Sequence, residues 1–363
     1  MDNLRIKFNN RRNTEFVSEL KSRVNGYFEE NKISPYANTA MVIKTIVMYS
    51  LYFIPFALIL TNLLSTAQVF LMYTIMGFGI LGLGCAVQHD ANHSAYSKNE
   101  TINRFLGFSL NLIGGNDYMW KIKHNILHHT YTNIHGKDED ISVVKIMRFS
   151  PNAPYSPVHR FQHIFAWLAY STLTLFWVFY FDFPKLKRYN GFGSPNPEVK
   201  HPVNEVIMLF VSKIVYFAVM IVLPLYIVNQ PWWVIIGGFV LMHFIAGFLL
   251  TTTFQLAHIV EDTEHPVPAE DGSVDAAWFV HQLETTANFA THNKVLTWFI
   301  GGLNFQVEHH LFPRICSIHY PMIAEIVRET AQKYDITYNV QPTLGFAISS
   351  HYKMLKKFSV KEA

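Results

Sequence analysis

Three short groups of histidines are the residues whose types and spacing best fit chemistry in this chain. Within each group, side chains lie three or four residues apart, a spacing that places them on one face of a helix. Because packing alone gives no reason to set imidazoles side by side, the pattern predicts metal ligation. The groups are QHDANHSAY with His89 and His93, KHNILHHTYTN with His124, His128 and His129, and NFQVEHHLFP with Gln306, His309 and His310.

The number of histidines predicts more than one metal ion. His129 is rotated by about 100° from His128 on a helix, so it can face a different ion. His258, in FQLAHIVED at the end of the last apolar stretch, brings the count to eight. Eight imidazoles are too many for one tetrahedral zinc ion and suit two first-row metals with about five or six ligands each. The remaining histidines are expected to be ordinary core or surface residues: His135, His159, His163, His201, His243, His265, His281, His292, His319 and His351.

Residue types narrow the chemistry of such a centre. Cys85 and Cys316, the two cysteines, lie in unrelated contexts, which excludes a disulfide scaffold and a thiolate-held metal. The zinc hydrolase motif HExxH is absent. Imidazole suits zinc, copper, nickel and iron alike, so ligand type leaves the metal open. A dinuclear histidine centre beside lipid chains fits the oxidation of an unactivated C–H bond with O2.

The composition indicates that membrane helices position these histidines. Of 363 residues, 50% are apolar and only 15% are charged, about half the usual charged share. The net charge of +3 gives no reason to expect nucleic acid as a partner. Each apolar stretch approaches the roughly 20 residues that a membrane span needs. The stretches cover about residues 43–63, 67–87, 164–183, 206–228 and 232–257.

The connectors between the stretches predict the topology. TNLLSTA after the first stretch and NQP after the fourth carry no Lys or Arg, so each is expected to be a hairpin turn on one face. The cationic connectors then lie on the cytoplasmic side, with Lys44 and Lys213 snorkelling back to it. Stretch 164–183 has basic flanks at both ends. The histidine groups before and after it can meet only if the chain crosses the membrane an even number of times between them. This stretch is therefore expected to lie in the interface or to dip into the membrane and return, while 206–228 and 232–257 form a spanning hairpin.

The predicted fold is therefore an all-α integral membrane protein. It has four transmembrane helices in two hairpins, interfacial helices and a cytoplasmic, histidine-rich metal cap. We expect one domain over residues 1–363, with a cytoplasmic N-terminal amphipathic segment at 1–42, a core at 43–330 and a cytoplasmic tail at 331–363. Phe16, Leu20, Val24 and Phe28 form one apolar stripe, expected to lie on the membrane or the protein body rather than on a separate partner.

Glycines in the second apolar stretch allow two interpretations. Gly77, Gly79 and Gly82 in GFGILGLG match a dinucleotide-binding fingerprint, but they lie inside an apolar span with no strand before them. We interpret them as positions where helices approach closely in a membrane.

The histidine groups resemble the three histidine boxes of the integral-membrane fatty acid desaturases. HDANH at 89–93, HNILHH at 124–129 and QVEHH at 306–310 stand in the order of that family. Gln306 stands in place of the first histidine of the third box, and this replacement resembles the front-end branch of the family. That branch includes delta-5, delta-6 and bacterial linoleoyl-CoA desaturases. HHTYTNIHGKDED, TTANF and GGLNFQVEHHLFP are also similar to that bacterial group, and the resemblance covers about residues 40–330.

The resemblance implies a reaction and a cofactor. A di-iron centre would use O2 and two electrons to introduce a cis double bond into an acyl chain carried on CoA or on a lipid. Bound haem or nucleotide is not expected. The implied location is a membrane, the bacterial inner membrane, with both termini and the active site cytoplasmic. The implied iron ligands are His89, His93, His124, His128, His129, His258, His309 and His310.

Further site residues are assigned by their places near these ligands. Gln306 is expected either to ligate through its amide oxygen or to leave a position for water or O2. Glu308 is grouped with Gln306 as catalytic, and it can also accept an imidazole N–H and fix its tautomer. Asp90, Asp138 and Asp140 are expected to act in the same outer role, with helix capping or solvated charge as alternatives. Trp120, Thr286, Asn288 and Asn304 are expected on the substrate path, with core packing as the alternative.

The electron donor and two competing functions remain open at this point. Front-end desaturases commonly carry a fused cytochrome b5 domain with a His-Pro-Gly-Gly motif, which is absent from this sequence. We therefore expect a separate ferredoxin, or cytochrome b5 with its reductase, to dock on the basic cytoplasmic face. The alternatives are a fatty acyl or lipid hydroxylase or related oxygenase on the same scaffold, and a non-catalytic membrane protein that binds metal or lipid.

Overall fold

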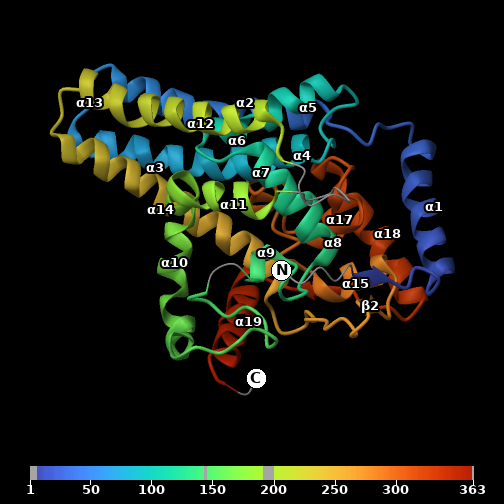
Figure 1. Ribbon diagram of the computed structural model, residues 1–363. Coiled ribbons are helices and arrows are strands. Elements are labelled where there is room, and N and C mark those ends of the chain that lie inside the picture. The colour runs from blue at the N-terminus through green and yellow to red at the C-terminus, as the bar shows by residue number, and fades with distance from the viewer. Residues whose placement is uncertain (1–5, 143–144, 191–199, 362–363) are drawn as a thin grey trace. The chain divides into compact units, whose positions relative to one another are not determined.

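A computed structural model describes residues 6–142, 145–190 and 200–361, which are mostly helical (Figure 1). The chain divides into two compact units. The first unit comprises Met1–Asn38, Lys123–Trp167 and Thr252–Ala363, and the second comprises Thr39–Ile122 and Leu168–Thr251. Three helices run across a boundary between these segments: η2 (Ile122–His128), α10 (Gln162–Phe176) and α14 (Trp232–His258).

The second unit is built from long apolar helices. Within it, α2 and α3 lie side by side (Figure 1), and Ser65 begins α3 with a capping box that includes Gln68. Its elements are α2 (Thr39–Leu60), α3 (Thr66–Gly82), η1 (Leu83–Val87), α4 (Gln88–Asn92), α5 (Glu100–Gly107), α6 (Ser109–Leu112), α7 (Asp117–Lys121), η4 (Trp177–Phe181), α11 (Asp182–Arg188), α12 (Val203–Phe217), η5 (Ala218–Val222) and α13 (Leu223–Ile227).

Glycine allows α3 to approach its neighbours closely. A Cβ atom on Gly79 would lie 2.9 Å from the backbone nitrogen of Tyr52 in α2, and one on Gly77 would lie 2.8 Å from the backbone oxygen of Met242 in α14. Both distances are shorter than carbon makes to backbone atoms, so any larger residue would push the helices apart. The interpretation of these glycines as helix-packing positions is confirmed.

Each predicted apolar stretch forms a helix. Among the described residues, five helical segments are long and apolar enough to cross a membrane. In Pro157–Arg188 only 22% of the most apolar window is buried, the smallest share of the five, so this segment presents most of its apolar surface outward. The segments are Thr39–Leu60, Thr66–Asn92, Pro157–Arg188, Val203–Ile227 and Trp232–His258.

Lys213 departs from its predicted place. It does not snorkel to the surface: it is 2% exposed, and its Nζ lies 2.8 Å from Asp182 Oδ2. The ammonium also donates to the backbone oxygens of Gly114 at 2.6 Å and Trp177 at 3.0 Å. Lys44 is likewise buried. A buried carboxylate and two carbonyls replace water around the Lys213 charge. The spacing of apolar residues in the sequence does not reveal this arrangement.

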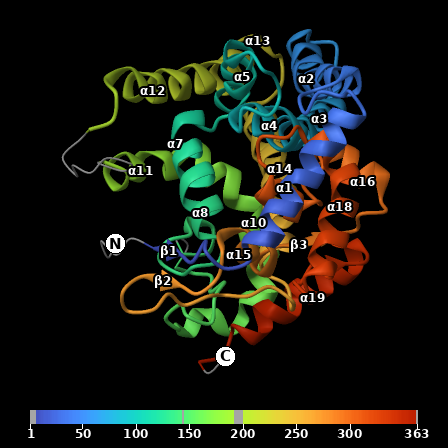
Figure 2. The ribbon, with the colours of Figure 1, turned by 90° about the vertical axis from the view of Figure 1, so that its right-hand side faces the viewer.

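The first unit holds short helices around a separate core. Helix α1 lies beside α18 (Figure 2), and the four residues of its apolar stripe are buried in one cluster with Ile323 and Val327 of α18. The stripe therefore lies on the protein body. The elements are β1 (Lys7–Phe8), α1 (Thr14–Glu30), α8 (His129–Tyr131), α9 (Glu139–Ser142), η3 (Pro157–Phe161), β2 (Ser273–Val274), α15 (Trp278–Thr285), β3 (Ala287–Phe289), α16 (Lys294–Phe299), α17 (Gln306–Leu311), η6 (Ser317–His319), α18 (Tyr320–Lys333), β4 (Asn339–Gln341) and α19 (Leu344–Lys357).

Two short parallel strand pairs depart from the all-α prediction. β1 pairs with β2 through Lys7 and Ser273, and β3 pairs with β4 through Asn288 and Val340. Strands of two or three residues are too short to show an alternating pattern, and their partners lie far away in the sequence. The second pair matters for the site because β3 lies between α15 and α17, which carry several of its residues.

Candidate metal centre

Six of the eight predicted ligands gather inside the first unit. Ring nitrogens of His128, His258 and His310 lie within 4.8 Å of one another, and so do those of His129, His309 and His310. His124 joins them, because its Nε2 lies 3.2 Å from Nε2 of His129. All six side chains are buried. His310 belongs to both groups, so it occupies the centre of the cluster.

The local helix type decides which histidines of the second box meet. His124 and His128 lie on the π-helix η2, where hydrogen bonds run between residues five apart. Their rings stack with centroids 5.3 Å apart, so the predicted shared face is present. The closest nitrogen approach is nevertheless from His124 to His129, five residues on. The prediction from α-helical spacing missed this pairing because the π-helix has wider turns.

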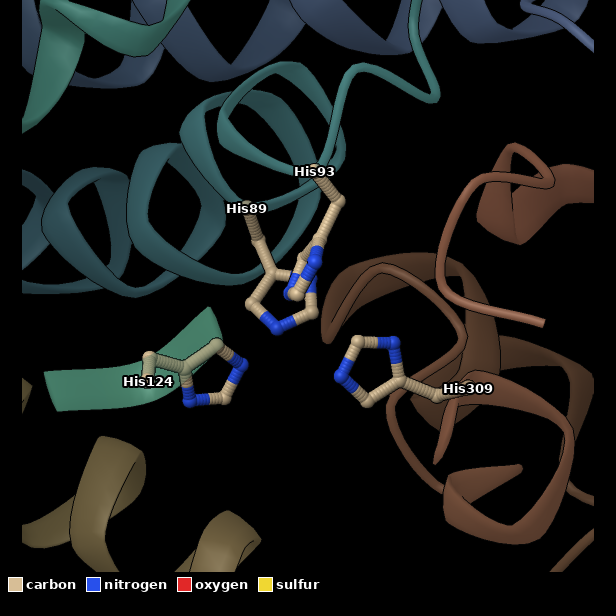
Figure 3. Close-up of side chains that lie close together, drawn as sticks. All are labelled: His89, His93, His124 and His309. Carbon is tan, nitrogen blue, oxygen red and sulfur yellow. The ribbon is translucent and has the colours of Figure 1, made fainter. Parts of the chain in front are cut away.

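Helix α17 presents the third box. Its last residues carry His309 and His310, and the helix ends at Leu311, before Pro313. Figure 3 shows His309 and His124 pointing toward one another, with nearly parallel rings whose centroids lie 5.8 Å apart. Two Gly residues with positive φ, Gly301 and Gly302, precede the helix. They allow the sharp approach to α17 that residues with a Cβ rarely adopt.

In four of these rings, a protein group contacts the ring nitrogen Nδ1. Each Nδ1 has a partner, which turns the opposite Nε2 toward the other imidazoles. The His258 Nε2 has no hydrogen-bond partner in the part of the chain that the structure describes. The partners of Nδ1 are Asp138 for His128 at 3.1 Å, the backbone oxygen of Thr285 for His258 at 3.4 Å, Tyr320 Oη for His309 at 3.2 Å and Gln282 Oε1 for His310 at 2.8 Å.

This donor set fits first-row metal ions. Two nitrogens that are each about 2.1 Å from one metal, at right angles, lie about 3.0 Å apart. The His124 and His129 nitrogens, 3.2 Å apart, have this spacing. Neutral imidazoles without thiolate suit iron among other first-row metals. The buried nitrogens would hold the ions, while the groups on Nδ1 would keep each ring oriented.

The first box lies in the second unit. His89 in α4 and His93 directly after that helix are buried, and their ring centroids are 4.9 Å apart. Figure 3 shows both rings extending in the same direction from one helix. Trp120 contacts both rings edge-on, at 5.6 Å and 5.8 Å. Asp90 Oδ1 lies 4.0 Å from His89 Nδ1, so the predicted carboxylate is near its imidazole.

The two loop aspartates both approach His128. Asp138 is fully buried, and its carboxylate also accepts the backbone N–H groups of Asn133 and Asp140, each at 2.9 Å. Asp140 Oδ2 lies 3.4 Å from His128 Nδ1, and its other oxygen is paired with Lys123. Backbone N–H groups hold the Asp138 carboxylate beside the His128 ring, whereas the Asp140 carboxylate also pairs with Lys123. The sequence predicted that both aspartates lie near metal ligands, but it did not distinguish these two arrangements.

Glu308 joins α17 to the β3–β4 pair. It is fully buried and accepts hydrogen bonds from Asn288 Nδ2 at 2.8 Å and Tyr338 Oη at 2.9 Å. Asn288 Oδ1 also accepts the backbone N–H of Val307 at 2.9 Å. Burial raises the pKa of Glu308 to about 7, although both hydrogen bonds act to lower it. The carboxyl and Asn288 thus anchor the helix that carries His309.

The remaining predicted residues are also buried. The Gln306 side chain, 1% exposed, has an amide Nε2 without a hydrogen-bond partner within the described ranges. Thr286 donates to the backbone oxygen of Gln282. Asn304 donates to Thr297 Oγ1 at 2.9 Å. Trp120 touches the first box, as described above, and the roles of these residues on a substrate path stay predictions.

Sequence reasoning missed the groups that hold Glu308, His309 and His310. Tyr320, Gln282 and Tyr338 lie in segments with no histidine spacing, and tertiary packing alone brings them to the site. Gln282 stands in HQLETTANF, next to the TTANF segment noted above. That proximity is the one signal in the sequence, and it does not reveal which side chain contacts a ligand.

Comparisons with known proteins agree with this site. A family model described as fatty acid desaturase matches residues 64–342. The sn-1 linoleoyl-lipid 6-desaturase of Synechocystis sp. is 36% identical over 97% of this chain and 97% of its own length. The enzyme of the same name from Arthrospira platensis is 34% identical over 95% and 93%. An acyl-lipid (8-3)-desaturase of Physcomitrium patens is 33% identical over 98% of this chain and 74% of its own length.

The family match covers well over half of the chain, and two relatives match it almost from end to end. Apolar helices long enough to cross a membrane and a buried histidine cluster are the parts that oxidation of a lipid chain needs. The chain belongs to the fatty acid desaturase family, and it is an oxidoreductase that desaturates fatty acyl chains.

Proposed function

We propose that this enzyme is a front-end desaturase that acts on a linoleoyl group carried on a membrane lipid. The observation that carries the proposal is the near full-length similarity to two linoleoyl-lipid 6-desaturases. Gln306 at the start of the third box supports the same branch. The new cis double bond then lies between an existing double bond and the carboxyl end. An acyl-CoA substrate is the alternative for the carrier, and product analysis by lipid class separates the two.

Two iron ions are proposed at the histidine cluster. His128, His258 and His310 would hold one iron, and His124, His129 and His309 would surround the other, with His310 between the two groups. Bound iron, with O2 and two electrons, supplies the oxidising chemistry that removes hydrogens from two adjacent carbons. The residues of this chain hold the ring nitrogens in place and keep water from the buried cluster.

His89 and His93 are proposed as further iron ligands, as the resemblance of the first histidine box implies. Trp120 contacts both of their rings. Asp90 would then act on His89 as Asp138 does on His128.

Gln306 is proposed to face the second iron, either through its amide oxygen or beside a position for water or O2. Its buried amide nitrogen has no hydrogen-bond partner among the described residues, which supports an amide that is not already held by the protein. Gln306→His offers the test, because an additional imidazole should raise iron affinity if the amide faces the metal. Unchanged activity and iron content would make Gln306 a packing residue. Glu308 is proposed to act through α17, and Trp120, Thr286, Asn288 and Asn304 remain proposed for the substrate path.

The proposed membrane arrangement has four spanning helices. Pro157–Arg188 is proposed to lie in the interface, supported by its basic flanks and outward apolar surface. Both termini and the histidines are then cytoplasmic, in a bacterial inner membrane. Cysteine-accessibility labelling that places Pro184–Arg188 outside the cell would overturn this topology. Residues 1–42, 43–330 and 331–363 are proposed to act together as one desaturase domain.

A separate ferredoxin, or cytochrome b5 with its reductase, is proposed as the electron donor, docking on basic groups of the cytoplasmic face. Added salt should then raise the apparent KM for the carrier, since surface charges are screened. An unchanged KM would argue against docking guided by charge.

The test of function is fatty acid analysis by gas chromatography and mass spectrometry, with double bonds located by derivatisation. A host expresses this chain with a compatible ferredoxin and receives linoleate, and His309→Ala is the control. A new double bond on the carboxyl side of the existing ones, absent from the control, is the expected product. A hydroxylated product, or a double bond toward the methyl end, would contradict front-end desaturation.

A further inference from the structure

Gln282 connects two of the histidine boxes inside the first unit. Its side chain is fully buried in α15. The amide oxygen Oε1 lies 2.8 Å from His310 Nδ1 and 2.9 Å from Thr132 Oγ1. The amide nitrogen Nε2 donates to the backbone oxygen of His129 at 3.2 Å. One side chain thus contacts His310 of the third box, the backbone of His129 at the end of the second box, and Thr132.

These contacts fix the orientation of the amide. The group that faces the His129 carbonyl must be the donor, so Nε2 lies there and Oε1 faces His310. An oxygen can only accept, so His310 Nδ1 must carry the proton. The opposite nitrogen, Nε2, is then deprotonated and can bind a metal ion. The amide therefore selects the tautomer of the one histidine that belongs to both ligand groups.

A neutral amide has a different effect from a carboxylate. His128 has Asp138 on its Nδ1, and an anion there makes the ring a stronger electron donor to a metal. His310 has Gln282 instead, which fixes the ring without adding negative charge. The two histidines of one group therefore have outer partners of unlike charge.

We propose that Gln282 is a positioning residue of the metal centre. It fixes the tautomer and rotation of His310 and holds that ring at a set distance from the His129 backbone. It does so without the negative charge that would lower the reduction potential of the metal. This inference rests on the proposed metal ligation by His310.

The test measures iron binding in three variants of the full-length protein in detergent. Gln282→Leu removes the hydrogen bonds at similar size, and Gln282→Glu keeps an acceptor for His310 but adds charge. Gln162→Leu is the matched control, because Gln162 is also fully buried and makes three hydrogen bonds, all to backbone atoms of Arg148 and Leu355. The readouts are the apparent dissociation constant for Fe2+ by chelator competition and the midpoint potential of bound iron.

The expected results differ among the variants. Gln282→Leu should weaken iron binding on the order of 10- to 100-fold, as losses of outer partners of metal ligands do. Gln282→Glu should retain iron and shift the midpoint potential to a more negative value. Gln162→Leu should bind iron as the wild type does, even if its Tm falls.

Two results would overturn the inference. One is wild-type iron affinity in folded Gln282→Leu. The other is an unchanged midpoint potential in Gln282→Glu, and this result overturns the inference even if Gln282→Leu does not fold. Wild-type protein that binds no iron would instead overturn the proposed metal centre, so the two failures are distinguishable.

Discussion

Two histidines on the same helix, α14, have opposite surroundings. His243 is fully buried, with Nε2 bonded to Tyr216 Oη at 2.8 Å and Nδ1 to Thr174 Oγ1 at 3.2 Å. His258, 15 residues on, has Nδ1 near the backbone oxygen of Thr285 and no hydrogen-bond partner for Nε2 among the described residues. Protein groups satisfy both nitrogens of the first ring and only one nitrogen of the second. Burial alone therefore does not identify a metal ligand, whereas the clustering of ring nitrogens around His258 makes it a candidate.

The same contrast extends to the two units. In the second unit, the buried Lys213 pairs with Asp182 and donates to two backbone carbonyls. In the first unit, Asp138 and Gln282 contact the Nδ1 atoms of His128 and His310. The Lys213 charge is thus balanced by protein groups alone, whereas the clustered histidines of the first unit fit a bound ion.

The largest expected effect separates the two histidines of α14. His258→Ala should lower desaturation by more than about 100-fold, because loss of a ligand exceeds the 10- to 100-fold cost of losing its outer partner. It should also lower the iron content. His243→Phe should keep its iron and lose stability, because Tyr216 and Thr174 lose a partner. Iron analysis and Tm of both purified variants check this, and equal iron loss in both would break the comparison.

The next effect concerns the ion pair of the second unit. Lys213→Met removes one of the two lysine partners of the buried Asp182 carboxylate and leaves it with Lys185 and Trp177 Nε1, which should cost up to about 3–5 kcal/mol of stability. Thermal unfolding in detergent measures it, and adding Asp182→Leu should recover much of the loss. Lys353→Met, which breaks the exposed pair with Glu261 at 3.0 Å, is the control. Equal Tm changes in the two single variants would show that the buried pair contributes nothing.

A smaller effect is expected at Glu308, a buried group of the first unit that protein donors satisfy. Tyr338→Phe removes one of its two side-chain donors, which should cost about 1–3 kcal/mol. Iron content should stay at the wild-type level, because Asn288 still holds the carboxyl. Tyr352→Phe on the exposed side of α19 is the control. Iron loss in folded Tyr338→Phe would show that Glu308 acts on the metal rather than through α17.

The smallest effect is expected on the surface of α1. Lys333→Ala removes the pair of Lys333 Nζ with Glu19 at 2.7 Å, and solvent screens both exposed charges, so no resolvable change in Tm is expected. Leu20→Ala in α1 should cost about 2–5 kcal/mol of stability, because Leu20 is fully buried against α18. A lower Tm for Lys333→Ala than for Leu20→Ala would show that the ion pair, rather than the buried apolar stripe, holds α1 against α18.

Local patterns in the sequence predicted much of the site. Histidine spacing identified His124, His309 and their neighbours, and apolar length identified the long helices, because both signals lie within one segment. The π-helix beneath His124 and the short strand β3 were missed, since neither has a pattern of its own. Gln282 and Asp182 were missed for another reason: their partners lie far away in the sequence and meet them only in the folded chain.

The most direct measurement is metal analysis of folded wild-type protein and of His310→Ala, as iron atoms per chain. His310 belongs to two of the candidate ligand groups of the first unit, so its loss should affect both ions. The expected result is two irons per chain in the wild type and a large loss in the variant. A single metal ion or none in the wild type, or unchanged iron in His310→Ala, would contradict a di-iron centre built on these histidines.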